Sequence, residues 1–177
     1  MVLKKFWSGL VLGLVIAGTA GMSHAGEKSV KILMPWDGEG SVYTIGTDKL
    51  LFMGEFEGIM YVETSAGELD AAYANCPASQ HIDMKGKQSS ATGYCTITIS
   101  SEEVVFAEWN CKGKVGVCEG TYNLTGGTGK YAGVTGSSEI LVRSVLNTLV
   151  LGMGSGDAVR SATGLAILPN LTYKLAK

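Results

Sequence analysis

The chain has 177 residues, of which 14 are Lys or Arg and 16 are Asp or Glu, giving a formal net charge of −2. No cluster of basic residues supplies the positive face that phosphates require, so a nucleic-acid partner is not expected. Aromatic residues make up only 8% of the chain, which argues against a membrane-spanning β-barrel with its aromatic girdles.

The first 25 residues have the pattern of a cleaved secretory signal peptide. Lys4 and Lys5 precede an apolar run at residues 10–17, and small side chains at Ser23 and Ala25 predict cleavage after Ala25. The alternative is an uncleaved anchor helix, but the apolar run is shorter than the roughly 20 residues that span a bilayer. We therefore expect a periplasmic or secreted protein with no membrane span after cleavage.

Cleavage is expected to leave one domain, residues 26–177. Removing 25 of the 177 residues, two lysines among them, leaves 152 residues with 12 basic and 16 acidic side chains, a net charge of −4. A chain of this length can form one domain with a hydrophobic core of its own.

Residues 51–62 form the clearest predicted strand. Phe52, Phe56 and Met60 share one face with glycines, whereas Glu55 and Glu57 lie on the other. This period of two is typical of a half-buried strand. Burying an unpaired carboxylate is costly and burying Phe or Met is favourable, so we expect the three apolar residues to line the interior, as candidate ligand contacts, and the carboxylates to face water. The opposite orientation would indicate a catalytic carboxylate.

The rest of the mature chain also reads as short strands separated by turn signals, with no clear amphipathic helix. The residues 154–157, Gly-Ser-Gly-Asp, predict a hairpin turn, and the C-terminal segment is expected to add an edge strand. The sequence thus predicts an all-β fold, an antiparallel closed barrel of about eight strands, with a two-sheet sandwich as second choice. The other expected strands are residues 30–34, 41–46, 67–74, 91–100, 103–110, 114–124, 137–151, 158–168 and 170–177.

The mature chain contains four cysteines, an even number that predicts two disulfides in an exported protein. Three pairings are possible, and we favour the one that joins sequence neighbours. The alternative is a zinc site made of these thiolates and His81, but no CxxC pair is present, so no metal or other cofactor is expected. The favoured pairs are Cys76–Cys95 and Cys111–Cys118.

Residues that could support catalysis are few. After loss of His24, His81 is the remaining histidine, and without a GxSxG nucleophile motif it is interpreted as a surface residue of a strand. Trp36, Trp109 and Tyr122 are interpreted as core or rim residues, the alternative being a stacking platform for a flat ligand. No catalytic residue is assigned.

Residues 126–136, Gly-Gly-Thr-Gly-Lys-Tyr-Ala-Gly-Val-Thr-Gly, form the most distinctive segment. The spacing fits neither a phosphate-binding loop nor a dinucleotide-binding fingerprint, so a tight turn between two strands is predicted, with Tyr131 packed inward. The segment resembles the turn of allene oxide cyclase-like and dirigent-like β-barrels. That resemblance implies an eight-stranded antiparallel barrel with an apolar cavity, in families that include enzymes acting on hydrophobic small molecules.

Two kinds of function follow as hypotheses. The first is a non-catalytic barrel that binds a hydrophobic small molecule or serves an interaction role in the cell envelope. The second is a cyclase or isomerase acting inside the same cavity. An open apolar cavity without a buried ionisable group would favour binding, an inward Glu would favour catalysis, and a filled barrel would favour interaction. The oligomeric state does not follow from the sequence.

Overall fold

The computed structural model describes residues 26–145 and 157–176, so the predicted signal peptide and the turn residues 154–156 lie outside the described part. The described residues form an all-β structure with one short 3-10 helix. The strands are β1 (Lys28–Gly46), β2 (Lys49–Thr64), β3 (Leu69–Asp83), β4 (Gln88–Thr98), β5 (Val104–Lys114), β6 (Val117–Gly127), β7 (Thr135–Ser144) and β8 (Asp157–Lys174), with the helix η1 (Gly129–Tyr131) between β6 and β7.

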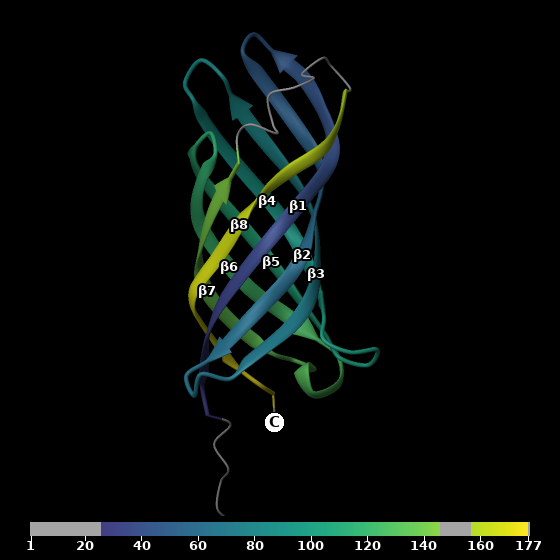
Figure 1. The fold of residues 1–177 in the computed structure, drawn as a ribbon, viewed down its shortest axis with the longest axis vertical. Coiled ribbons are helices and arrows are strands. Elements are labelled where there is room, and N and C mark those ends of the chain that lie inside the picture. The colour runs from purple at the N-terminus through teal and green to yellow at the C-terminus, as the bar shows by residue number, and fades with distance from the viewer. Residues whose placement is uncertain (1–25, 146–156, 177) are drawn as a thin grey trace, which may run out of the picture.

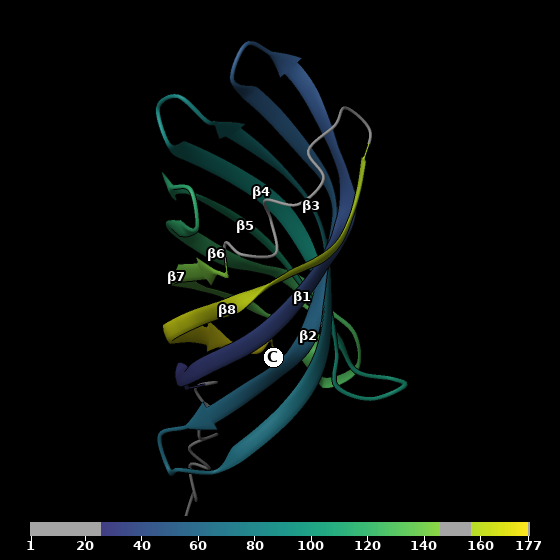
Figure 2. The ribbon, with the colours of Figure 1, turned by 45° about the horizontal axis from the view of Figure 1, so that its top comes forward.

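The eight strands form a closed antiparallel barrel, which confirms the predicted fold class and rules out the two-sheet sandwich. Each strand pairs with the next one in the chain, and β8 pairs with β1 to complete the circle. Figure 1 shows the strands running obliquely to the long axis, with the start of β1 and the end of β8 at the lower end of the barrel. In the turned view of Figure 2, the β1–β2 hairpin rises above the neighbouring strands.

Strands β1 and β3 are longer than the sequence predicts. Residues 30–34 and 41–46 belong to one strand, because the proline and glycines between them continue the β-structure. The ladder between β1 and β2 passes from Leu33–Tyr61 to Trp36–Gly58 without a pair at Pro35, so the missing N–H of proline removes no bond there. Strand β3 likewise continues through Pro77 to Asp83 instead of ending at residue 74.

The C-terminal segment is not an edge strand, contrary to expectation. Residues 157–174 form one continuous strand, β8, which pairs with β7 on one side and with β1 on the other. A closed barrel has no edge at which an additional strand could lie.

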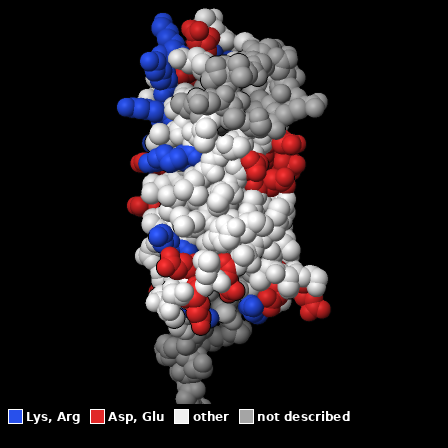
Figure 3. Space-filling model, viewed as in Figure 1, with Lys and Arg blue, Asp and Glu red and all other residues white. Residues whose placement is uncertain are grey.

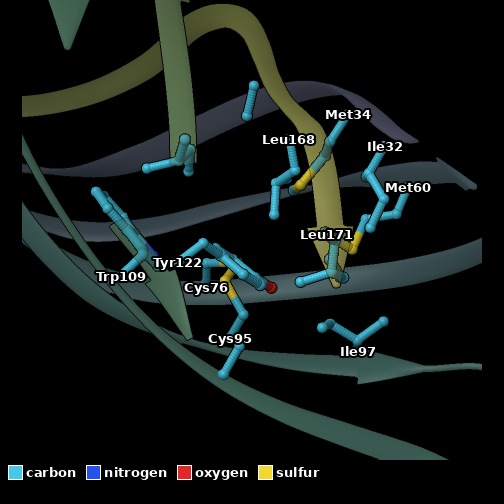
Figure 4. Close-up of a cluster of buried hydrophobic side chains, with 14 of the residues drawn as sticks. Ile32, Met34, Met60, Cys76, Cys95, Ile97, Trp109, Tyr122, Leu168 and Leu171 are labelled. Atoms are coloured by element: carbon cyan, nitrogen blue, oxygen red, sulfur yellow. A yellow bond between two sulfur atoms is a disulfide. The ribbon is translucent and has the colours of Figure 1, made fainter. Parts of the chain in front are cut away.

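Alternate residues of each strand point into the barrel and form two packed clusters. The larger one extends from Val30 and Leu171 near the start of β1 to Cys111 and Cys118 near the β5–β6 turn. It includes Met60, Tyr122 and Leu168, which are among the most deeply buried side chains. Figure 4 shows this cluster, with side chains from several strands converging on the barrel axis. The smaller cluster contains Val42, Leu50, Phe52 and Ile82, near the β1–β2 and β3–β4 turns.

Inward glycines make room for the large aromatic side chains of the interior. The ring of Trp36 lies over Gly164, where an added Cβ would come within 2.3 Å of the indole. The ring of Phe56 lies over Gly38, where the corresponding distance is 2.8 Å. Rings that cover glycines of a neighbouring strand are a known way to bend and close a sheet. These glycines therefore belong to the barrel wall and are not breaks between strands.

The glycine-rich segment forms the predicted turn, and Tyr131 packs against the larger cluster as expected. Gly129 and Gly133 have φ values of 55° and 70°, which glycine adopts without steric cost. The Thr128 hydroxyl donates a hydrogen bond to the Glu102 carbonyl, and the Val104 N–H donates one back to that hydroxyl. These bonds tie the β6–β7 turn to the β4–β5 turn.

Among the described residues, no helix has the length and apolar character needed to cross a membrane.

Candidate functional site in the barrel lumen

The barrel contains an apolar cavity of about 80 Å³, lined by side chains from all eight strands. One water needs roughly 10–15 Å³ of such space, so the cavity can hold several waters or part of a small organic molecule. Met60, Tyr122 and Leu168 belong to the larger cluster and line the cavity. Ser144, at the end of β7, and Gly116, in the β5–β6 turn, also line it.

The three predicted ligand contacts, Phe52, Phe56 and Met60, all line this cavity. Phe52 and Met60 are buried, with exposed fractions of 5% and 2%, and Phe56 is half-buried. Glu55 and Glu57 are exposed on the outer wall of the same strand. The predicted orientation of residues 51–62 is therefore confirmed, and the costly alternative with inward carboxylates is not adopted.

Four aromatic rings from β1, β2 and β5 form a continuous group in the cavity wall. The ring centroid of Phe56 lies 5.0 Å from that of Trp36, in an edge-to-face arrangement, and 5.4 Å from that of Phe52. Trp109 adds a third ring contact to Phe56, at 6.3 Å. Offset and edge-to-face pairs at these distances are attractive beyond their buried area. The two tryptophans therefore belong to the interior and form no exposed stacking platform.

Both disulfides face the cavity, and the pairing predicted from sequence is confirmed. Cys76 on β3 bonds to Cys95 on β4, and Cys111 on β5 bonds to Cys118 on β6. All four residues are buried and line the cavity. The bonds join neighbouring strands of two hairpins from the inside, so the sulfur atoms form part of the apolar wall. Disulfides of this kind are typical of an oxidising, extracytoplasmic environment.

The side chains around the cavity carry no formal charge. Among the described residues that line it, none is Asp, Glu, Lys, Arg or His. His81 lies exposed on the outer wall of β3, as predicted. The zinc alternative fails, because the four thiolates that it needed are consumed in disulfides and no group of three or more metal-ligating side chains occurs among the described residues.

Two buried hydroxyls near the cavity, those of Tyr122 and Ser89, have no hydrogen-bond partner among the residues that the structure describes. Tyr122 reaches across the lumen beside the Cys76–Cys95 disulfide, and its hydroxyl points toward Leu171 (Figure 4). Burial in these apolar surroundings raises the pKa of Tyr122 well above the ordinary value of a phenol. A buried hydroxyl without a partner destabilises the fold by about 1–3 kcal/mol.

Replacing Tyr122 with phenylalanine should change the alkaline stability of the protein. Because its pKa is raised, the Tyr122 phenol of the folded protein stays protonated above pH 10, where the phenol of the unfolded chain ionises. Ionisation therefore favours the unfolded state, and the free energy of unfolding falls as the pH rises. We expect the wild-type free energy of unfolding to fall by up to about 1.4 kcal/mol more per pH unit than that of Tyr122→Phe between pH 10 and 12. Urea titrations at pH 8 to 12 measure this.

The matched control is Tyr43→Phe, which removes a phenol from the exposed outer wall. Below pH 9, Tyr122→Phe should be as stable as the wild type or more stable by about 1 kcal/mol, because it removes an unsatisfied group. Identical pH profiles for the wild type and Tyr122→Phe would show that this phenol is not held in an apolar site.

The cavity is a small apolar chamber with an uncharged lining. No family model, curated protein or solved structure matches this chain. The resemblance to allene oxide cyclase-like and dirigent-like barrels thus depends on the glycine-rich turn alone and stays a prediction.

Several lining residues were not predicted from the sequence, among them Gln80, Ile82 and Ser89. A signal for the first two was present, because the period of two that places Cys76 inside continues through Pro77 to Gln80 and Ile82. The predicted strand ended at residue 74, so the alternation was not extended to Gln80 and Ile82. Ser89 gave no signal, since a polar residue beside a turn is ordinarily exposed.

Proposed function

We propose that this chain is an exported barrel, periplasmic or secreted, that binds a neutral hydrophobic small molecule in its lumen and catalyses no reaction. The observation that supports this function is the apolar cavity with no charged side chain among its described lining residues. An apolar chamber gains free energy from burying apolar surface, and it disfavours a charged ligand because no opposite charge offsets the loss of hydration. The resemblance of the β6–β7 turn to cavity-bearing barrels agrees with this proposal.

The rival function, a cyclase or isomerase, requires a group that moves a proton at the ligand. Glu55 and Glu57 were the candidate carboxylates, and both lie on the outer wall. Tyr122 is the ionisable residue at the cavity, and its raised pKa keeps the phenol neutral at physiological pH. The geometry therefore favours binding over acid–base catalysis. The presence of a cavity likewise favours binding over an envelope interaction role with a filled barrel.

Native mass spectrometry of protein purified from its own host tests the proposal directly. We expect an added mass that is released by organic solvent and belongs to a neutral apolar compound. A retained charged metabolite, or conversion of the released compound on incubation with fresh protein, would contradict the proposal.

Blocking the cavity provides the second test. Ala91 on β4 lines the cavity, whereas Ala71 on β3 is exposed on the outer wall, so phenylalanine at each position adds the same bulk inside or outside. Ala91→Phe should weaken binding of the neutral fluorophore N-phenyl-1-naphthylamine at least tenfold, and Ala71→Phe should leave it unchanged. Equal binding by both variants would place the fluorophore outside the lumen.

A further inference from the structure

The outer wall of the barrel is apolar on the side formed by β2, β1, β8 and β7. The registers place Tyr61 opposite Leu33, Leu33 opposite Ile167, and Ile167 opposite Leu141, so one row of apolar side chains crosses four strands. Ile59 and Tyr73, which pair across β2 and β3, extend the row and are 40% and 43% exposed. We name these six residues the apolar face. Figure 3 shows it as part of a broad area without charge.

Four carboxylates lie beside the apolar face, two on β1 and two on β2. Asp37 pairs with Glu57 and Glu39 pairs with Glu55, so like charges stand directly opposite each other at both positions. Directly opposed like charges destabilise a sheet. We name these four residues the acidic quartet. Figure 3 shows acidic side chains gathered at this border of the uncharged area, over β1 and β2.

The acidic quartet has no neutralising cation among the described residues. The ion pairs of the described chain involve other carboxylates. Two members have neutral partners, since the Tyr73 hydroxyl donates a hydrogen bond to Glu57 and the Asn75 amide donates one to Glu55 at 3.0 Å. Four negative charges are thus held together at the rim of an exposed apolar surface. The repulsion among these charges and the exposure of the apolar side chains to water are each unfavourable.

The opposite side of the barrel has a different outer surface. Successive cross-strand rows there contain Thr92, Asn110 and Thr121, then Ser90, Lys112 and Glu119. Such mixed polar rows are ordinary for a soluble sheet face. The exposed Tyr94 and Phe106 of that side stand opposite Glu108 and Thr96, whereas the side of β1 and β2 combines a continuous apolar row with directly opposed carboxylates. An apolar centre with a charged rim is the anatomy of an interface.

We propose that the apolar face and the acidic quartet together form a docking surface for a partner polypeptide that presents apolar side chains flanked by lysine or arginine. Basic side chains on the partner would relieve the repulsion within the quartet, and its apolar side chains would cover the row through Leu33 and Ile167. A groove lined by Ile59, Tyr61 and Leu165, with Asp37 and Arg143, gives such side chains a place to insert.

Two other occupants fit the charges less well. A second copy of this chain brings a net charge of −2 and another acidic quartet. Lys31 and Arg143, the cations beside the apolar face among the described residues, already pair with Glu63 and Glu119. An anionic membrane surface would be repelled by the quartet, because like charges oppose approach. A basic, apolar polypeptide is the occupant that complements both features.

The test uses a fluorescently labelled 12-residue peptide of alternating leucine and lysine as the probe, with glutamate in place of lysine as the control peptide. We expect the lysine peptide to bind at 20 mM salt at least tenfold more tightly than the glutamate peptide, and to weaken at least tenfold at 500 mM salt. The quartet variant Asp37→Asn/Glu39→Gln/Glu55→Gln/Glu57→Gln should lose at least tenfold in affinity.

Matched controls distinguish binding at this surface from nonspecific electrostatic and hydrophobic binding. The variant Glu68→Gln/Asp70→Asn/Glu102→Gln/Glu108→Gln removes four exposed carboxylates elsewhere and should bind the peptide normally. Leu33→Ser/Ile167→Thr should weaken binding, whereas Tyr94→Ser/Phe106→Ser, on the other side of the barrel, should not. Because the quartet variant relieves repulsion, its melting temperature should equal or exceed that of the wild type, which shows that it folds.

Three results would overturn the proposal. The first is equal binding of the lysine peptide by the quartet variant and its charge-matched control. The second is self-association of the wild type in sedimentation analysis that Leu33→Ser/Ile167→Thr abolishes, which would assign the surface to a second copy. The third is binding to phosphatidylglycerol vesicles that depends on the apolar face.

Discussion

Phe56→Ala should lower the free energy of unfolding by about 3–5 kcal/mol, the usual cost of truncating a phenylalanine in a core. Phe56 contacts the rings of Trp36, Phe52 and Trp109, and it packs against both buried clusters. Its removal enlarges a cavity that is already present, so neighbouring side chains cannot easily collapse into the space. Equilibrium denaturation in urea at pH 7 measures the change.

Glu57→Gln, one position along the same strand, serves as the control for Phe56→Ala. Glu57 lies exposed on the outer wall, and surface substitutions usually alter stability by no more than about 0.5 kcal/mol. A comparable loss in both variants would indicate that the strand as a whole is sensitive to substitution. A loss below about 1 kcal/mol for Phe56→Ala would show that the ring contributes little to the packing of the lumen.

Removing the longer disulfide is the second change with a large expected effect. The Cys76–Cys95 bond closes a loop with a sequence separation of 19 residues, and Cys111–Cys118 closes one of 7. If the bonds act mainly by restricting the unfolded chain, they contribute about 3 and about 2.5 kcal/mol. Cys76→Ala/Cys95→Ala should therefore be the less stable of the two double variants, by urea denaturation under non-reducing conditions.

A reductant provides the control for both disulfide variants. The wild type should lose about 5 kcal/mol or more in a reducing buffer, a large part of the stability of a small domain. A variant with alanine at all four positions should unfold at the same urea concentration with and without reductant. An effect of the reductant on that variant, or none on the wild type, would contradict the role assigned to the bonds.

The barrel could be predicted from the sequence because its local signals agree with its global architecture. The alternation from Phe52 to Met60 identified both the strand and its inner face. The pairing of the four cysteines followed from sequence proximity, since each pair bridges one hairpin of a barrel in which sequence neighbours are spatial neighbours.

Other features depend on contacts that the sequence does not display. Gly38 and Gly40 lie between the two strands expected at residues 30–34 and 41–46, yet they lie under the rings of Phe56 and Phe52 and continue β1. The cavity is the space left after side chains from eight strands have packed, and no local pattern encodes it. The opposition of Asp37 to Glu57 depends on the register between β1 and β2, which the alternation within one strand does not reveal.

Closure of the barrel by its first and last strands couples folding to completion of the chain. β1 begins at Lys28 and pairs with β8, whose last residue is Lys174. One side of β1 therefore has no partner until the C-terminal strand is available, and such long-range pairing forms slowly. In the meantime the unpaired strand is a template for association with other chains. Chains truncated before residue 157 should accordingly accumulate as aggregates and not as smaller barrels.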